Sequence, residues 1–348
     1  MAPSTRADRF LRACRREPVD TTPIWIMRQA GRYLPEYRKV RGTTDFLTLC
    51  KTPALATEVT LQPIDILGVD AAILFSDIMV PLEPMGLKLT IDEGVGPRIH
   101  NPVRTADDIA KLAIPDPIAG TGFVMDAVRQ IRKELAGKVP LIGFAGAPFT
   151  LAAYAVEGGG SRNYTHIKKL MFSEPKLAHA LFDKLTETVI AYLRAQIEAG
   201  VQAVQLFDSW GGVLSPFDFE TFSLPYLKRI VDGVKGRGAP VILFGTDLGL
   251  QLERLASTGA DVVGVDWRMN LDEARARLPN TAVQGNLDPV VLFGPQSELE
   301  VRVRDILERA GTAPGHIFNL GHGILPETPV ENAKALVELV HRLGKHTA

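Results

Sequence analysis

The strongest constraint on the fold is a recurrence of short apolar, β-branched runs, each followed by a loop rich in Gly, Asp or Pro and then by a segment with helical periodicity. This alternation is typical of parallel βαβ units. We predict a strand over each of the eight runs. They cover residues 24–27, 71–75, 140–145, 203–207, 241–245, 261–266, 282–286 and 316–320.

Helices are predicted between these runs, near residues 53–67, 122–136, 176–199, 217–235, 249–258, 271–278, 297–310 and 330–344. Apolar residues from Leu181 to Ile197, for example, recur at helical spacing. Eight strands alternating with helices predict an α/β fold of the (β/α)8 (TIM) barrel type, whose strands are buried on both faces. A doubly wound open sheet is the alternative, but no Gly-x-Gly-x-x-Gly follows the first run, where a dinucleotide-binding sheet would carry it.

The chain is expected to form one barrel domain over residues 1–348, with residues 1 to about 20 as an N-terminal cap segment. Hydrophobic residues make up 46% and charged residues 23%, as in a globular protein with a large core. The net charge of −1 gives no overall field that would hold nucleic acid or an anionic membrane.

The two cysteines, Cys14 and Cys50, are too few for a disulfide framework or a thiolate metal cluster, which favours a reducing compartment. The first residues lack the apolar run of a signal peptide, and no apolar stretch reaches the length of a membrane span. We therefore expect a cytoplasmic protein.

Residues 76–120 interrupt the alternation. Residues 87–91 alternate like an exposed hairpin strand and are flanked by Pro and Gly. We predict a β-ribbon excursion after the second strand. A loop of this length in a compact domain is uncommon unless it covers a site, and a merely decorative insertion is the alternative.

The first apolar run leads directly into a basic segment. Arg28, Arg32, Arg38, Lys39 and Arg41 lie within fourteen residues, with Glu36 as the only acid among them. Arginine stays charged at any working pH and binds a carboxylate through two parallel hydrogen bonds. The segment is therefore a candidate anion site, and a solvated basic loop is the alternative.

Polar side chains follow every predicted strand. In a barrel these positions share the carboxyl-end face, where active sites lie, so the pattern predicts a concave site there. The residues are Arg28, Arg32, Ser76, Asp77, Tyr154, Asp208, Ser209, Trp210, Thr246, Asp247, Asp266, Asn286, Asp288 and His322.

Four segments resemble the signature blocks of the uroporphyrinogen decarboxylase family: IWIMRQAGRYLPEYR (24–38), FSDI (75–78), GFAGAPFTLAAYAVEGGGS (143–161) and NLGHGI (319–324). The similarity extends from about residue 5 to about residue 344. It implies a single-domain barrel, usually a homodimer, that decarboxylates the four acetate side chains of uroporphyrinogen III to coproporphyrinogen III without cofactor or metal. The chain differs from the best-known members at Phe149, where Trp is common, and at Asp208 and Trp210 around the serine.

Within this resemblance, Asp77 is the candidate for the centre of the substrate. Uroporphyrinogen is a cyclic tetrapyrrole with eight carboxylates and four pyrrole N–H donors that can converge on one acceptor. An ionised carboxylate offers about four lone-pair sites for them. When a pyrrole carbon is protonated, the ring becomes cationic and withdraws the electrons of the breaking C–C bond, so Asp77 would stabilise a charge that exists only along the reaction path. The alternative for Asp77 is a helix N-cap.

The arginines Arg28 and Arg32 match those of the family and are expected to hold carboxylates, with Arg41 as a third clamp. A pKa above 12 makes arginine a poor proton donor, so Arg28 is expected to act electrostatically. We predict Asp77, Arg28 and Tyr154 as the catalytic residues.

The remaining predicted binding residues are Phe144 as pocket floor, Tyr154 and Ser209 as hydrogen-bond donors, and His322 as a group that neutralises a propionate. The glycines beside His322 would permit close approach. Structural roles for the tyrosine and the histidine are the alternatives.

Two other functions are alternatives. A corrinoid-linked methyltransferase of the same superfamily would use zinc held by His and Cys, but both cysteines precede the second strand and no His-x-Cys pair stands near the later strands. A non-catalytic tetrapyrrole-binding protein would keep the arginines without needing Asp77 beside Tyr154.

Overall fold

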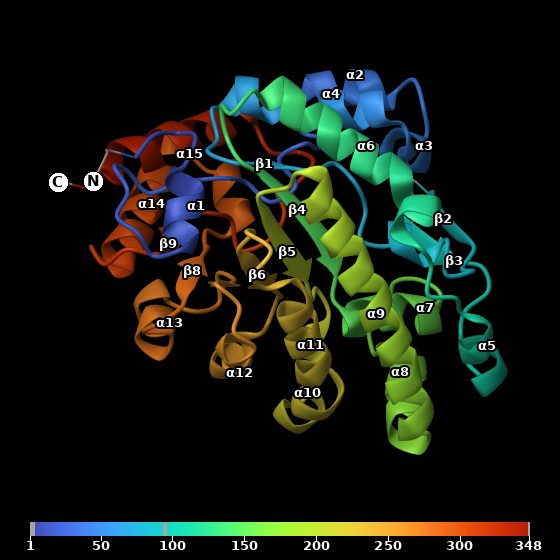
Figure 1. Cartoon of the computed structure of the whole chain (residues 1–348). Helices are drawn as coiled ribbons and strands as arrows, with labels where there is room; N and C mark the ends of the chain where they lie inside the picture. The colour runs from blue at the N-terminus through green and yellow to red at the C-terminus, as the bar shows by residue number, and fades with distance from the viewer. Residues whose placement is uncertain (1–3, 93–95, 347–348) are drawn as a thin grey trace.

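The computed structural model describes residues 4–92 and 96–346. Its main sheet is parallel, with seven strands in the order β1-β4-β5-β6-β7-β8-β9. The sheet is curled, and helices cover its outer face (Figure 1). The strands are β1 (Ala72–Ile73), β4 (Leu141–Gly146), β5 (Ala203–Phe207), β6 (Val241–Phe244), β7 (Val262–Gly264), β8 (Ala282–Gln284) and β9 (His316–Ile317). Seven of the eight predicted strands are therefore present.

The predicted helices are also present, several of them with nearly the predicted limits. They are α4 (Pro53–Leu67), α6 (Pro117–Leu135), α9 (Pro175–Ala199), α10 (Pro216–Phe222), α11 (Leu224–Val234), α12 (Leu252–Ser257), α13 (Leu271–Arg277), α14 (Gln296–Ala310) and α15 (Val330–Leu343). The limits of α4 have local causes, because Pro53 suits the first turn of a helix and Gly68 takes the left-handed conformation that ends one.

The prediction of a single helix over 217–235 is wrong, because the chain forms α10 and α11 with a break at Ser223. Pro225 has no N–H to donate to the preceding turn, so a continuous helix would lose a hydrogen bond there. Six shorter helices were not predicted. They are α1 (Arg9–Cys14), α2 (Pro35–Arg41), α3 (Phe46–Lys51), α5 (Ala106–Lys111), α7 (Pro148–Glu157) and α8 (Thr165–Ser173).

The predicted strand over 24–27 is not a strand. Ile24 makes one parallel bridge to Phe318, and the donors further along are taken by side chains. The N–H of Ile26 is bound by the Gln29 side chain, and that of Met27 by the Asn319 side chain. The ladder of backbone hydrogen bonds between this segment and the segment around Phe318 therefore stops after one residue.

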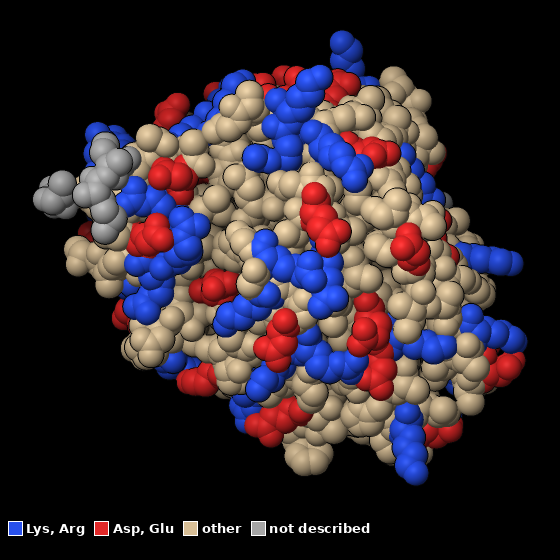
Figure 2. Space-filling model, in the orientation of Figure 1, with Lys and Arg blue, Asp and Glu red and all other residues tan. Residues whose placement is uncertain are grey.

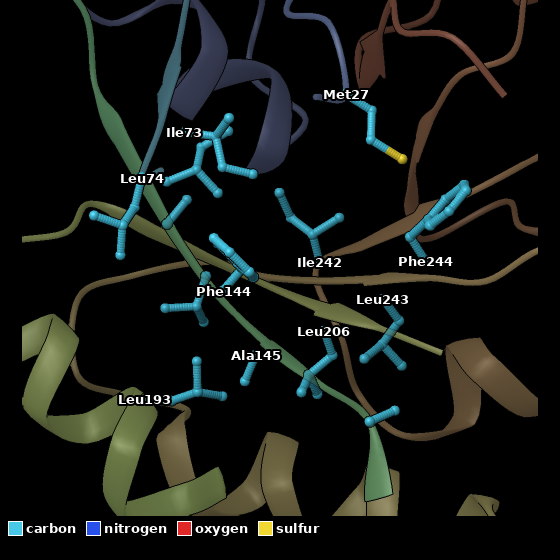
Figure 3. Packing of buried hydrophobic residues seen from close by; sticks show 14 of the residues in the cluster. Met27, Ile73, Leu74, Phe144, Ala145, Leu193, Leu206, Ile242, Leu243 and Phe244 are labelled. Atoms are coloured by element: carbon cyan, nitrogen blue, oxygen red, sulfur yellow. The ribbon is translucent and has the colours of Figure 1, made fainter. Parts of the chain in front are cut away.

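The core contains the side chains on both faces of the sheet (Figure 3). Phe144, Ile242 and Phe244 point toward the concave interior, whereas Leu206 and Leu243 point toward the helices. This alternation follows from the period of two along a strand, and both sets are buried because helices cover the outer face.

Between β1 and β4 the chain forms an antiparallel pair, β2 (Leu89–Asp92) with β3 (Gly96–Ile99). This pair lies within residues 76–120, for which a β-ribbon excursion was predicted, and Gly94 of the predicted flanks lies outside the described residues. The N–H of Ile99 donates to the carbonyl of Gly158 at 2.9 Å, which ties this ribbon to the end of α7.

The N-terminal segment, of which residues 1–3 lie outside the described part, packs α1 against β9. Arg6 donates to the carbonyls of Ile64 and Val69 at the end of α4. The first and last described residues lie near each other, because the Ser4 hydroxyl donates to the Asp20 carboxylate and the N–H of His346 donates to the Asp20 carbonyl at 3.0 Å. Among the described residues, none of the helices is both long and apolar enough to span a membrane.

Candidate functional site

Arg28 lies on a tight turn that follows the first apolar run. Its φ of 64° is left-handed, which is uncommon for a residue other than glycine. Gln29 fixes the turn, because its side-chain oxygen accepts from the N–H of Ile26 and its amide donates to the carbonyl of Ala71, each at 3.0 Å. Gln29 is fully buried while Arg28 is exposed. The turn therefore presents the guanidinium to solvent from a rigid base.

Asp77 follows β1, where that strand separates from β4. The N–H of Leu74 still donates to the carbonyl of Ile142 at 3.0 Å, but the next N–H, of Phe75, donates to the Thr60 hydroxyl of α4 at 2.9 Å. The chain thus leaves the sheet just before Asp77.

The Asp77 carboxylate is half-buried, and one of its oxygens closes a local turn. Its Oδ1 accepts from the N–H of Met79 at 2.9 Å, just before the 3₁₀ helix η1 (Val80–Leu82). Met79 is the N-cap of that helix and no side chain caps it, so Asp77 is not the helix N-cap that the sequence offered as the alternative. Its other oxygen has no hydrogen bond to any described residue. Burial raises the pKa of Asp77, while the Met79 N–H and the charge of Arg28 oppose the rise.

Tyr154 lies on α7 with its ring packed against Trp210, at 5.9 Å between centroids. Burial raises the pKa of its phenol, and the charge of Asp77 raises it further, whereas the charge of Arg28 lowers it. The hydroxyl is therefore a proton-bearing donor at neutral pH. Because Arg28, Asp77 and Tyr154 act on one another electrostatically, the structure brings these three predicted residues together.

His322 lies beside Arg28 after β9. Its Nδ1 accepts from the N–H of Gly323 at 2.6 Å, so the proton of the neutral ring is on Nε2. Burial, and after it the charges of Arg28 and Arg268, lower the His322 pKa to about 4. A ring with this pKa is neutral at pH 7 in the absence of substrate, and its predicted role of neutralising a propionate stays a prediction. The neutral ring offers a hydrogen bond.

Gly323 allows Arg28 to lie against the chain after β9. A Cβ at this glycine would lie 2.3 Å from Cδ of Arg28, which is far closer than any real contact. Gly323 therefore leaves room for the Arg28 side chain, whereas the close approach of a propionate beside His322 stays a prediction.

Phe144 and Ser209 line neighbouring strand ends. Phe144 is buried on β4 in edge contact with Phe207, at 5.6 Å between centroids. Its main-chain N–H and C=O are both bound by the Gln196 amide of α9, each at 2.9 Å, which fixes this part of the interior. Ser209 is half-buried, and its carbonyl accepts from the Thr246 hydroxyl at 2.8 Å.

The other arginines have different surroundings. Arg32 is exposed, and its side chain has no hydrogen-bond or ion-pair partner among the described residues. Arg38 instead braces the loop by donating to the carbonyls of Arg32 and Tyr33. Arg41, at the end of α2, donates to the carbonyl of Thr44. Neither Arg32 nor Arg41 is among the charges that shift the pKa of Asp77 or of Tyr154.

One charged group at this face was missed by the sequence reasoning. Arg268 pairs with Asp247 at 2.8 Å and Asp266 at 2.9 Å, and its guanidinium lies 4.2 Å from the ring centroid of Trp267. Its charge acts on His322. In the sequence, Arg268 lies two positions after Asp266, the polar residue at the end of a predicted strand. Nothing in the pattern distinguished Arg268 from a charged residue on the surface.

Among the described residues, no group of three or more His, Cys, Asp or Glu is placed to hold a metal ion. Cys14 and Cys50 are buried free thiols, and burial raises the pKa of both well above the ordinary value.

Comparison with known proteins gives a consistent result. A family model described as "Uroporphyrinogen decarboxylase (URO-D)" matches residues 5–343. A protein of Myxococcus xanthus named uroporphyrinogen decarboxylase is 62% identical over 97% of both chains. One of the same name from Geobacter metallireducens is 57% identical, covering 97% of this chain and 99% of that protein.

Among solved structures, a methyltransferase from Methanosarcina mazei has a TM-score of 0.82 at 22% identity, with 97% of this chain and 98% of that chain covered. A B12-independent methionine synthase from Shewanella sp. W3-18-1 has a TM-score of 0.56 at 13% identity, with 83% and 88% covered. These two likenesses concern the fold alone.

Proposed function

Because this chain belongs to the uroporphyrinogen decarboxylase family, we propose that it removes the carboxyl groups of the four acetate side chains of uroporphyrinogen III, giving coproporphyrinogen III and CO2. It is a carboxy-lyase of tetrapyrrole (haem) biosynthesis. The observation that carries the proposal is the 62% identity over 97% of both chains. The mutual influence of Arg28, Asp77 and Tyr154 supports it.

Asp77 accepts hydrogen bonds from the pyrrole N–H groups. One of its oxygens is held by Met79 and the other has no bond to a described residue, so the carboxylate is fixed but keeps accepting capacity. Burial raises its pKa, which makes an isolated charge there costly. Converging N–H donors and a cationic ring both favour the ionised form.

In each round, a proton adds to a pyrrole carbon and the ring becomes a cation. The C–C bond to the carboxylate breaks, its electron pair moves into the ring, and CO2 leaves. A proton then adds to the former acetate carbon, and the ring carbon loses its proton. The net change is one proton taken up and one CO2 released for each acetate converted to methyl. The substrate itself serves as electron sink, so no cofactor is invoked.

The substrate carboxylates are held by charge and by hydrogen bonds. Arg28, Arg32 and Arg41 are the cationic clamps, and an exposed arginine without a side-chain partner among the described residues, such as Arg32, can form two parallel bonds. The neutral ring of His322 donates from Nε2. Tyr154 and Ser209 donate from their hydroxyls, and Phe144 forms part of the apolar floor.

The whole chain forms one (β/α)8 barrel domain, in which residues 23–27 take the eighth strand position. Support comes from the bridge of Ile24 to Phe318 on one side and, on the other, from the N–H of Asp70, which donates to the carbonyl of Ile24 at 2.7 Å. The β2–β3 ribbon, tied to the end of α7, lies beside the site as its cover.

The protein works as a cytoplasmic homodimer. Large exposed apolar side chains follow three strands at the carboxyl-end face, and their contact with a second copy would remove them from water. They are Phe217, Leu250, Val290 and Phe293, with exposed fractions of 75%, 73%, 58% and 44%.

The decisive test is incubation with uroporphyrinogen III under anaerobic, reducing conditions, followed by counting carboxyl groups in the product by mass spectrometry. We expect loss of four carboxyl groups without added metal or cofactor. Planar, oxidised uroporphyrin should not react, because its conjugated ring cannot be protonated as a separate pyrrole. An unchanged porphyrinogen would refute the proposed activity, and CO2 release from the porphyrin at a similar rate would refute ring protonation.

A further inference from the structure

Asp208 is a buried carboxylate that the proposed reaction does not use. It follows directly after β5 with an exposed fraction of 2%, and its N–H donates to the carbonyl of Phe244 at 2.7 Å. Two hydroxyls bind its oxygens, Thr150 at 2.7 Å and Ser223 at 3.1 Å. Among the described residues, no basic side chain pairs with it. Within the described part of the chain, the cost of burying this charge is thus offset only by hydrogen bonds from neutral groups.

The two hydroxyls connect Asp208 to different parts of the molecule. Thr150 lies in the first turn of α7, four residues before Tyr154 and so on the same side of the helix. The Thr150 hydroxyl also accepts from the N–H of Trp210 at 3.1 Å. Ser223 lies at the break between α10 and α11, and its hydroxyl bonds only to Asp208 within the described part of the chain. Of these two hydrogen bonds, only the one from Thr150 connects Asp208 to the candidate site.

The loop after β5 is packed closely around this carboxylate. A Cβ at Gly211 would lie 2.6 Å from Oδ2 of Asp208. The Trp210 ring that precedes it packs between Tyr154 and Tyr164, at centroid distances of 5.9 and 5.6 Å. A shift of the carboxylate or of Thr150 would therefore move the wall against which the Tyr154 ring rests.

We propose that Asp208 is a positioning residue, which through Thr150 holds the Trp210 loop against α7 and so sets the place of the Tyr154 hydroxyl relative to Asp77. Asp208 itself contacts no substrate. This inference rests on the proposed function, because it assigns a consequence for catalysis to the position of Tyr154.

The energetics of the site are consistent with a role other than stability. Burial raises the pKa of Asp208 to about 6, and the hydroxyls only partly offset the rise. A buried charge without a cation is a net cost, and apolar replacements of buried ionic groups are often neutral or stabilising.

The test compares the two hydroxyls that bind the same carboxylate. Thr150→Val is nearly isosteric and removes the branch to the site, whereas Ser223→Ala removes the other branch and is the matched control. Both should lower Tm. We expect Thr150→Val to lower kcat by at least about tenfold with a smaller change in KM, while Ser223→Ala stays within about twofold of wild type. Thr150→Ser, which keeps the hydroxyl, should restore most of kcat.

A second readout does not depend on turnover. Trp210 emission, obtained by subtracting the spectrum of Trp210→Phe, should shift in unliganded Thr150→Val and remain unchanged in Ser223→Ala. If wild type fails to release CO2, the proposed function fails, and this fluorescence difference still tests the positioning. Should Thr150→Val not fold, Asp208→Asn takes its place with the same expected loss. Equal kcat values and equal emission for the two hydroxyl variants would overturn the inference.

Discussion

At the scale of single residues, the site depends on electrostatic influence between side chains that are distant in sequence. The charge of Asp77 raises the pKa of Tyr154, and the charge of Arg28 opposes the pKa changes of both. All three residues were predicted, because each follows an apolar run and lies in a family block. Their mutual proximity could not be predicted from spacing, since it depends on how the strand ends meet.

Substitutions at Asp77 can separate the effect of the carboxylate's charge from the effect of its position. Asp77→Asn keeps an oxygen that can accept from Met79, whereas Asp77→Glu keeps the charge but moves it. If the carboxylate stabilises the cationic ring, Asn should lose about 10²–10³-fold in kcat and Glu should retain more activity. Steady-state kinetics of CO2 release, with circular dichroism as a check on folding, would measure this.

The electrostatic role of Asp77 is wrong if folded Asp77→Asn turns over at more than about a tenth of the wild-type rate, a deficit under about 1.4 kcal/mol. If the carboxylate only positions the substrate, Glu should be as poor as Asn and the loss should appear mainly in KM.

Asp208 predicts a pH dependence of stability. Its pKa is raised from 3.8 to about 6 in the fold, so the folded protein holds this proton more tightly than the unfolded chain. The contribution of this proton to the free energy of unfolding is about 3 kcal/mol. It is fully present below about pH 4 and is lost as the pH rises to about 6. Asp208→Asn cannot ionise, so its free energy of unfolding should rise relative to wild type by about that amount between pH 4 and pH 7. Urea denaturation at both pH values measures it, and a constant difference would contradict the assignment.

At the scale of elements, the site depends on the contact between the turn at Arg28 and the chain after β9. The bridge from Ile24 to Phe318 and the bond from Met27 to the Asn319 side chain join these two segments. The sequence predicted a strand at 24–27, and the structure replaces most of its ladder with side-chain bonds. Such bonds have no periodicity, so no pattern in the sequence could reveal them.

Gly323 tests this contact. Gly323→Ala adds a methyl group where Cγ, Cδ and Nε of Arg28 now lie, all within 2.8 Å of the position that its Cβ would take. The arginine must move, and we expect KM for uroporphyrinogen to rise about tenfold, the value of one charge-assisted hydrogen bond.

The matched control is Gly122→Ala in α6, whose nearest other side-chain atom is 3.9 Å away. It should leave KM unchanged and raise Tm slightly, because alanine favours a helix more than glycine does. Similar KM values for the two alanine variants would show that Arg28 does not depend on Gly323.

At the scale of the whole molecule, charge does not explain substrate binding. Positive and negative side chains are interspersed over the face shown in Figure 2, and the net charge is −1. We therefore propose that local arginines attract a substrate with eight carboxylates. These charges are screened within about 10 Å at 0.1 M salt and about 3 Å at 1 M.

We accordingly expect KM to rise steadily with NaCl concentration while kcat changes little, measured with Tm at each concentration as a control for folding. A KM independent of salt would count against the arginine clamps.

The dimer is the second prediction at this scale. Light scattering after size-exclusion chromatography should give a mass of two chains. Phe217→Glu combined with Leu250→Glu should shift it toward one chain, because charges would then be buried in the apolar contact. Val301→Glu, at an exposed apolar position on α14, is the control and should remain dimeric. A dimeric double variant would exclude this face as the interface.

The sequence alone determined the alternation of seven strands with their helices, because burial on both faces of a parallel sheet leaves continuous apolar runs, and proline and glycine mark the helix ends. It also identified the residues that follow each strand. Tertiary structure alone decided which of them interact, and that the pKa of His322 is lowered, because a pKa depends on burial and on charges brought near by folding. Arg268 beside His322 and Thr150 beneath Trp210 were likewise beyond the sequence, since contacts across separate strand ends leave no local pattern.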